Sequence, residues 1–64
     1  MKYEIIVRRR AEGYYESEGE AWASEDSAPN DSVITKLHHT TTEEHGIALC
    51  VTDLTTKAAE AFGE

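Results

Sequence analysis

The strongest constraint on the fold is a pair of alternating stretches that flank Gly13. In residues 2–10, KYEIIVRRR, apolar and polar side chains alternate, as in a strand with one face on a core. The members expected to face the core are Tyr3, Ile5 and Val7, and Ile6 is the exception to the alternation. Gly13 can adopt a positive φ in a tight turn at 11–13. We therefore expect an antiparallel hairpin whose second strand covers 14–24.

The second strand of this hairpin has two different faces, because successive strand residues point to opposite sides. One face carries Tyr14, Glu16, Glu18, Glu20 and Trp22, and the other carries Tyr15, Ser17, Gly19, Ala21 and Ala23. The second set is mostly small and favours close packing by a helix, with a bulge or close approach at Gly19. A helix over 16–26 is the alternative, since Glu and Ala favour helices. Ser17, Gly19 and the two aromatics disfavour it.

The remaining chain predicts a loop, two more strands and a helix. Residues 24–32, SEDSAPNDS, hold the only proline and predict the loop. Residues 33–42 are rich in β-branched types and predict a strand. Its two faces would carry Val33, Thr35, Leu37 and His39, and Ile34, Lys36, His38 and Thr40. Residues 43–46 would turn the chain into a central apolar strand at 47–52, IALCVT.

The C-terminal segment predicts a helix that Asp53 caps and Gly63 ends. Its apolar stripe would consist of Leu54, Ala58, Ala61 and Phe62. The expected fold class is α+β: a small antiparallel sheet of about four strands with one short C-terminal helix packed on one face. The glutamates would project from the opposite, solvent-facing side, which antiparallel sheets allow.

Length and charge limit the possible functions. The 64 residues suffice for a single domain, 1–64, with one small core. Cys50 is the only cysteine, and the N-terminus has the pattern of neither a signal peptide nor a membrane span, so we expect a cytoplasmic monomer. The net charge of −7 opposes direct nucleic-acid binding and suits a basic protein surface.

Catalytic and metal sites are poorly supported by the sequence. His38, His39, His45 and Cys50 offer zinc-ligand atoms, but adjacent strand histidines point to opposite faces and no CxxC or HExxH spacing is present. Cys50 lies in an apolar run, where a cysteine usually behaves as a small buried hydrophobe. An acid–base pair of carboxylates needs a pocket that separates their pKa values. We expect no such pocket on the flat, open face that carries the glutamates. We expect no enzyme activity and no cofactor.

The acidic face is the candidate binding surface. The expected partner-binding residues are Tyr14, Glu16, Glu18, Glu20, Trp22, Glu25, Asp26 and Asp31. A row of carboxylates coarsely imitates a nucleic-acid backbone, but one row is sparser than the phosphates of duplex DNA, so loop acids would supply a second row. Arg8 and Arg10 would pair across the hairpin with the acidic row. A second interpretation is a solvated face whose charges oppose aggregation.

With its small size, its acidity and the stretch GYYESEGEAWASED on an open sheet, the chain resembles the phage-encoded anti-CRISPR inhibitors. The resemblance is to their DNA-mimic members directed at type I systems, type I-C among them. It implies a protein that covers the basic DNA-binding or PAM-reading surface of a CRISPR effector (Cascade) subunit in the host cytoplasm. The alternative function is an antitoxin-like interaction module that binds one partner by shape through Tyr14 and Trp22.

Overall fold

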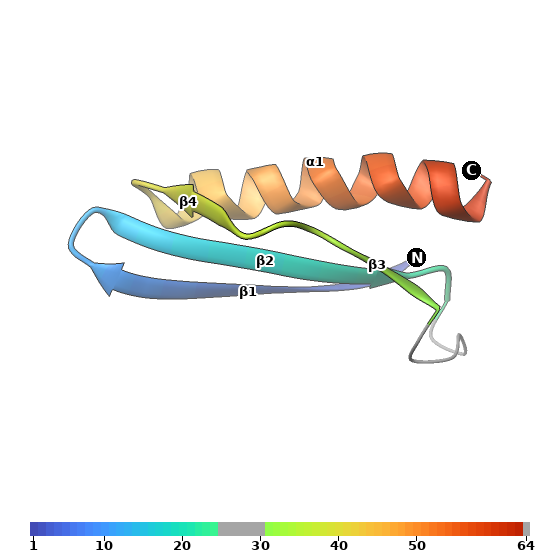
Figure 1. Ribbon diagram of the computed structural model, residues 1–64, viewed down its shortest axis with the longest axis horizontal. Helices are drawn as coiled ribbons and strands as arrows, with labels where there is room; N and C mark the ends of the chain where they lie inside the picture. The colour runs from blue at the N-terminus through green and yellow to red at the C-terminus, as the bar shows by residue number, and fades with distance from the viewer. Residues whose placement is uncertain (25–30, 64) are drawn as a thin grey trace.

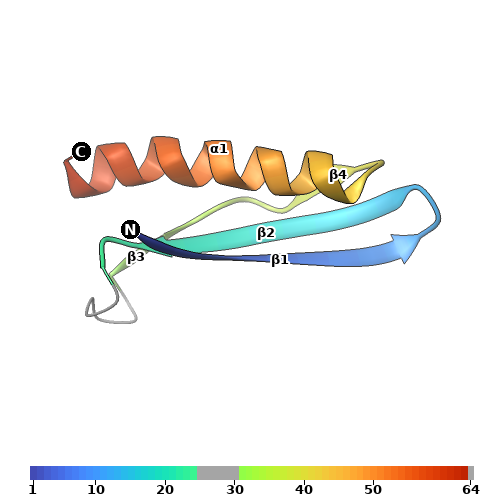
Figure 2. The same ribbon diagram turned by 180° about the vertical axis from the view of Figure 1, so that it is seen from behind.

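The computed structural model describes residues 1–24 and 31–63, which form two layers, a sheet and one helix (Figure 1). The elements are β1 (Lys2–Ala11), β2 (Tyr14–Trp22), β3 (Ser32–Ile34), β4 (His38–Thr40) and α1 (Glu43–Phe62). All strand pairs are antiparallel, and α1 runs along the length of β2 on one face of the sheet (Figures 1 and 2). The expected α+β class is confirmed, although the helix, at 20 residues, is longer than predicted.

The hairpin of β1 and β2 forms where the alternating pattern predicts it. Ile5 lies opposite Gly19 and Arg8 lies opposite Glu16 in the register. Gly13 adopts a φ of 71°, the left-handed conformation that the tight turn requires. A register shift between Arg9 and Ala11 ends the regular pairing just before this turn.

The middle strand of the sheet is β2, because β1 pairs along one side of it and both β3 and β4 pair along the other. The expected single strand over 33–42 is wrong in two respects: it is interrupted at residues 35–37, and it ends at Thr40 because Thr42 already caps the helix. Three residues separate Ile34 from His38, whereas two separate their partners Glu20 and Ser17, so this side carries one extra residue. Thr35 bridges the interruption by donating its N–H to the Gly19 carbonyl at 3.0 Å.

The extra residue reverses the phase of the alternation. Before it, Val33 lies opposite Ala21 on the face that packs on the helix; after it, His38 lies opposite Ser17 on that same face. His39 consequently joins Ile34 on the open face, which corrects the expected faces of this segment. A one-residue slip has this effect because strand side chains repeat every two residues.

The helix begins eleven residues earlier than the sequence predicted, since its N-cap is Thr42 rather than Asp53. The expected turn at 43–46, strand at 47–52 and cap at Asp53 are wrong, since all of these residues lie inside α1. Thr42 is the N-cap, and its hydroxyl accepts a hydrogen bond from the His45 N–H at 3.2 Å. The predicted helix end is confirmed, because Gly63 takes the left-handed conformation with φ 75°.

The core is a narrow seam of small residues between α1 and β2. Helix residues one turn apart form its upper side: Gly46, Cys50, Leu54 and Ala58. Beneath them, Ser17 and Ala21 are fully buried. A Cβ on Gly46 would stand 2.6 Å from the Ser17 Oγ, and one on Gly19 would stand 3.0 Å from the Leu54 Cδ1. The predicted close approach of a helix to this face is confirmed.

The edge strand β1 is less buried than the alternation predicts. Ile5 and Val7 are half-buried, whereas Tyr3 is 50% exposed and does not belong to the core. The helix contacts β2 more extensively than β1, so the side chains of β1 are less covered than those of β2. The buried cysteine is confirmed, although Cys50 is in the helix rather than in a strand.

Candidate interaction surface

The face of the sheet opposite α1 carries the predicted row of side chains. Ser17 and Ala21 point to the helix, so the even-numbered residues of β2 point away from it. These are Tyr14, Glu16, Glu18, Glu20 and Trp22, and the register adds Lys2, Glu4, Ile6 and Arg8 from β1, Ser32 and Ile34 from β3 and His39 from β4. We call this surface the open face.

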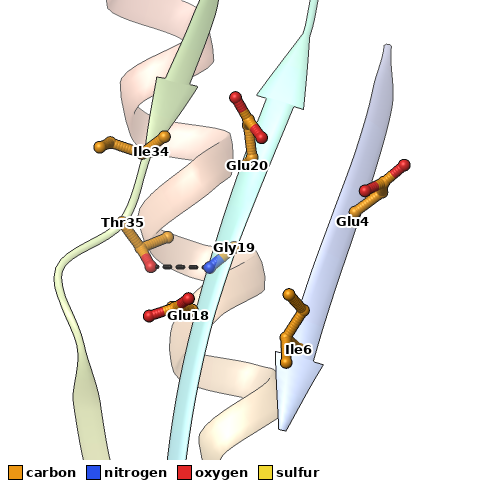
Figure 3. Close-up of a pocket in the computed structure, with 7 residues that line it drawn as sticks. All are labelled: Glu4, Ile6, Glu18, Gly19, Glu20, Ile34 and Thr35. Carbon is orange, nitrogen blue, oxygen red and sulfur yellow. Dashed lines mark hydrogen bonds between the residues drawn. The ribbon is translucent and has the colours of Figure 1, made fainter.

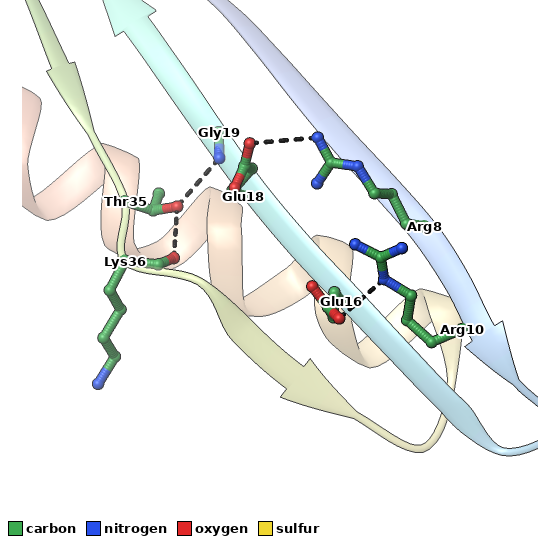
Figure 4. A network of polar contacts seen from close by, with 7 residues as sticks. All are labelled: Arg8, Arg10, Glu16, Glu18, Gly19, Thr35 and Lys36. Carbon is green, nitrogen blue, oxygen red and sulfur yellow. Dashed lines mark hydrogen bonds and ion pairs between the residues drawn. The ribbon is translucent and has the colours of Figure 1, made fainter.

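Two of the three glutamates of β2 are paired with arginines of β1 (Figure 4). The Arg10 Nε donates to the Glu16 Oε1 at 2.8 Å, and the Arg8 guanidinium stands 3.5 Å from the Glu18 Oε1. The Glu16 side chain is only 15% exposed, whereas that of Glu18 is 42% exposed. The predicted cross-strand pairing is confirmed, and it neutralises the end of the row nearest the hairpin turn.

The other end of the row keeps its negative charge. Glu4 and Glu20 lie directly opposite each other in the register, an arrangement in which like charges repel. Glu20 accepts a hydrogen bond from the Ser32 hydroxyl at 2.6 Å. Within residues 1–24 and 31–63, neither carboxylate forms an ion pair with Lys or Arg.

A hollow of about 220 Å³ lies between these carboxylates. Figure 3 shows Glu4, Glu18 and Glu20 on the near side of the strands, with the helix behind the sheet. Ile6 from β1 and Ile34 from β3 flank the hollow, and they are 49% and 63% exposed. Exposed apolar side chains beside uncompensated carboxylates form a surface that suits a partner side chain with an apolar stem and a cationic head.

The two predicted aromatic residues stand at opposite ends of β2. Tyr14 stacks on His39 with ring centroids 5.5 Å apart, and its hydroxyl is 2.7 Å from the His39 Nδ1. The ammonium of Lys2 lies 5.2 Å from the centre of the Trp22 ring, at cation–π distance. Trp22 follows Tyr14 by eight positions along the strand, about 27 Å at the usual rise. They therefore do not form one patch.

The remaining predicted residues lie beyond the sheet. Asp31 is exposed just before β3, while Glu25 and Asp26 fall outside the described residues. Sequence reasoning placed Glu4 on the water-facing side of the first strand but left it out of the binding residues, and it missed Ile6, Ile34 and His39 as members of the open face. The hairpin register could have revealed Glu4 and Ile6, because they lie across from Glu20 and Glu18. The position of Ile34 depends on how β3 pairs with β2, and that of His39 depends on the phase reversal at 35–37.

The histidines and the cysteine are dispersed. His38 and His39 lie on opposite faces, and the His38 Nε2 stands 3.6 Å from the Asp53 Oδ2 on the helix side. Cys50 is completely buried. In the part of the chain that the structure describes, no three His, Cys, Asp or Glu side chains are grouped so that they could hold a metal ion.

Comparisons with protein-family models, with curated proteins and with solved structures found no match to this chain. No helix among the described residues is long and apolar enough to cross a membrane.

Proposed function

We propose that this protein is a non-enzymatic inhibitor that covers a basic, DNA-binding surface of a partner protein with its open face. The observation that supports this best is the hollow between Glu4, Glu18 and Glu20, flanked by Ile6 and Ile34. An arginine of a DNA-binding surface would place its aliphatic stem against the isoleucines and its guanidinium on the carboxylates.

The charge of the open face limits how far it imitates DNA. The open face has four glutamates and two cations, Lys2 and Arg8, and Arg10 reaches it by binding Glu16. Together these residues leave a formal charge of −1, compared with −7 for the chain. The mimicking part is therefore the end of the sheet with Glu4 and Glu20, which form no ion pair with Lys or Arg among the described residues. Glu18 adjoins it, with only a long, exposed contact of 3.5 Å to Arg8. Of the expected loop acids, Asp31 lies at this same end, because it immediately precedes β3.

The resemblance to anti-CRISPR inhibitors makes a type I effector subunit the partner to test first. Its PAM-reading surface must carry cationic side chains, because it holds duplex DNA. A protein of opposite charge would reach that surface faster at low ionic strength and would exclude DNA by occupying it.

The direct test is the binding of a PAM-containing duplex to purified type I-C Cascade in the presence of this protein, measured by fluorescence anisotropy. We expect the wild-type protein to displace the duplex, and added salt to weaken its binding. Glu18→Gln with Glu20→Gln should weaken inhibition more than tenfold, about 1.4 kcal/mol. The matched control removes the same charge at the start of α1, with Glu43→Gln and Glu44→Gln, and should inhibit almost like wild type.

Two results would contradict the proposal. If wild type does not compete with DNA, type I-C Cascade is not its target. If both double variants lose the same small amount of inhibition, only the total charge matters and the open face is a solvated surface.

A binding module that recognises its partner by shape is the second candidate, and the exposure of Ile34 favours it. Because Tyr14 and Trp22 are at opposite ends of β2, such a module would use Ile6 and Ile34 instead of an aromatic patch. Ile34→Ser would then abolish binding, whereas the Glu18 and Glu20 double variant would bind normally at every salt concentration.

A further inference from the structure

The outer edge of β1 is a long strand edge with no partner among the described residues. β1 is ten residues long and pairs only with β2. The backbone N–H and C=O groups along such an edge are a template for another strand, and proteins usually shorten, bend or cover it. Here the register shift between Arg9 and Ala11 affects only the end of the strand, so residues 2–9 remain regular.

The sequence of β1 is complementary to itself in the antiparallel direction. We propose that a second copy of this chain pairs with β1 about a two-fold axis at Ile6, so that two sheets join into one. The opposed residues would be Ile6 with Ile6, Ile5 with Val7, Glu4 with Arg8, Tyr3 with Arg9 and Lys2 with Arg10 of the second copy.

Each face of this joined sheet has matching chemistry. Directly opposed residues of antiparallel strands point to the same side, so the open faces of the two copies become continuous. On that side the two Ile6 side chains, each 49% exposed, cover one another between two Glu4–Arg8 ion pairs. On the helix side, the half-exposed Tyr3 meets the exposed Arg9, a cation–π pair.

The pairing also supplies a partner that each subunit lacks. Glu4 faces Glu20 within its own subunit and has no cation there among the described residues. Arg8 holds Glu18 only loosely, at 3.5 Å with both side chains about two-fifths exposed. Arg8 of the second copy can therefore reach Glu4 without breaking a buried contact.

Neighbouring registers are less favourable. An axis at Ile5 sets Lys2 against Arg8 and Glu4 against Ile6 of the second copy, and an axis at Val7 sets Ile6 against Arg8. The axis at Ile6 opposes like charges only at Lys2 and Arg10, a pair that occurs twice in the dimer. Each of these cations already has a partner in its own subunit, since Lys2 lies over Trp22 and Arg10 binds Glu16.

The dimer departs from the expected monomer and stands independently of the proposed function. Were both correct, Arg8 of the second copy would bind Glu4, and Glu18 and Glu20 would remain for the partner protein. The dimer would set the β2 glutamates of the second copy antiparallel to those of the first, three strand spacings or about 14 Å away. A single chain is too sparse in carboxylates to imitate duplex DNA, and the second copy would supply the missing row.

Sedimentation equilibrium over a micromolar-to-millimolar concentration series tests the dimer. Wild type should shift from one chain to two as the concentration rises. Glu4→Arg alone sets the introduced arginine against Arg8 of the second copy, and Arg8→Glu alone opposes two glutamates, so each should raise the dimer dissociation constant more than tenfold. Glu12→Arg in the hairpin turn and Lys36→Glu after β3 make the same charge changes away from the edge and should dimerise normally.

Two combinations make the test specific for this register. The double variant Glu4→Arg with Arg8→Glu restores both pairs and should dimerise like wild type. A mixture of the two single variants should form a heterodimer, because arginines on one chain then face glutamates on the other. Circular dichroism of each variant checks that the fold is intact.

Wild type that remains one chain at millimolar concentration overturns the proposal. So does a dimer that the single variants leave unchanged, because it must use another surface. Failure of the mixed single variants to associate rejects the register with its axis at Ile6.

Discussion

At the scale of single residues, the contact between Gly46 and Ser17 determines how close the helix lies to the sheet. Inside a helix, Gly is normally less stable than Ala by roughly 1 kcal/mol of helix-forming free energy. Gly46 is nevertheless accommodated because an added Cβ would collide with the Ser17 hydroxyl at 2.6 Å. That hydroxyl is completely buried and forms no hydrogen bond within the described residues, which itself costs stability.

We predict that Gly46→Ala destabilises the protein by about 1–3 kcal/mol through overpacking, despite the better helix propensity of Ala. Ser17→Ala should be neutral or slightly stabilising, since it removes a buried hydroxyl without a partner. In the Ser17→Ala background, Gly46→Ala should be less harmful. Urea unfolding of the four proteins gives this double-mutant cycle, and additive free energies would show that the two residues are not in contact.

At the scale of elements, α1 is a 20-residue helix whose beginning depends on a capped first turn. Thr42 satisfies the His45 N–H, and Glu43 and Glu44 place negative charge at the positive end of the helix dipole. The Lys57 ammonium donates to the Ile34 carbonyl at 2.8 Å and ties the middle of the helix to the end of β3. The helix is thus held to the sheet by this side-chain hydrogen bond as well as by the packing of its buried residues.

Thr42→Ala should lower the free energy of unfolding by about 1 kcal/mol, because the helix loses its N-cap. Thr42→Asp should retain wild-type stability, since a carboxylate can accept the same bond. Thr41→Ala, one residue earlier and exposed, is the control with the same chemical change. Thermal melts followed by circular dichroism compare the stability of the three variants with that of wild type. If Thr41→Ala and Thr42→Ala lose the same stability, Thr42 is not a specific N-cap.

At the scale of the whole molecule, stability depends on one seam of contacts between two layers. Leu54 is the largest fully buried side chain, and beneath it lies Gly19. A core in a chain of this length rarely supplies more than about 3–5 kcal/mol. The sheet and the helix should therefore unfold together, because neither has a second core to retain its structure.

We predict that Leu54→Ala is largely unfolded at 37 °C, as such a truncation costs about 2–5 kcal/mol. Val51→Ala, a change of similar kind at a position 37% exposed on the same helix, should melt close to wild type. Circular dichroism and Trp22 fluorescence should give coincident transitions in wild type. Separate transitions would mean that the layers unfold independently.

Short-range pattern was enough to predict much of the fold. The hairpin, its turn at Gly13, the small residues of β2 under a helix and the helix end at Gly63 all follow from alternation and turn chemistry. The same pattern placed Glu16, Glu18 and Glu20 on the open face. It could not show which of these glutamates form ion pairs, because that depends on how the long Arg8 and Arg10 side chains reach diagonally across the strands.

By itself, the sequence determined the elements whose signal is local: a strand repeats every two residues, and a glycine permits positive φ. Only the tertiary structure decided that residues 47–52 are helical, because a short apolar run fits a buried strand and a buried helix equally well. The small face of β2 accepts a helix at close range, so Cys50 and Leu54 pack there at helical spacing. The extra residue at 35–37 was likewise decided by packing, which brings His38 beneath the helix and leaves His39 on the open face.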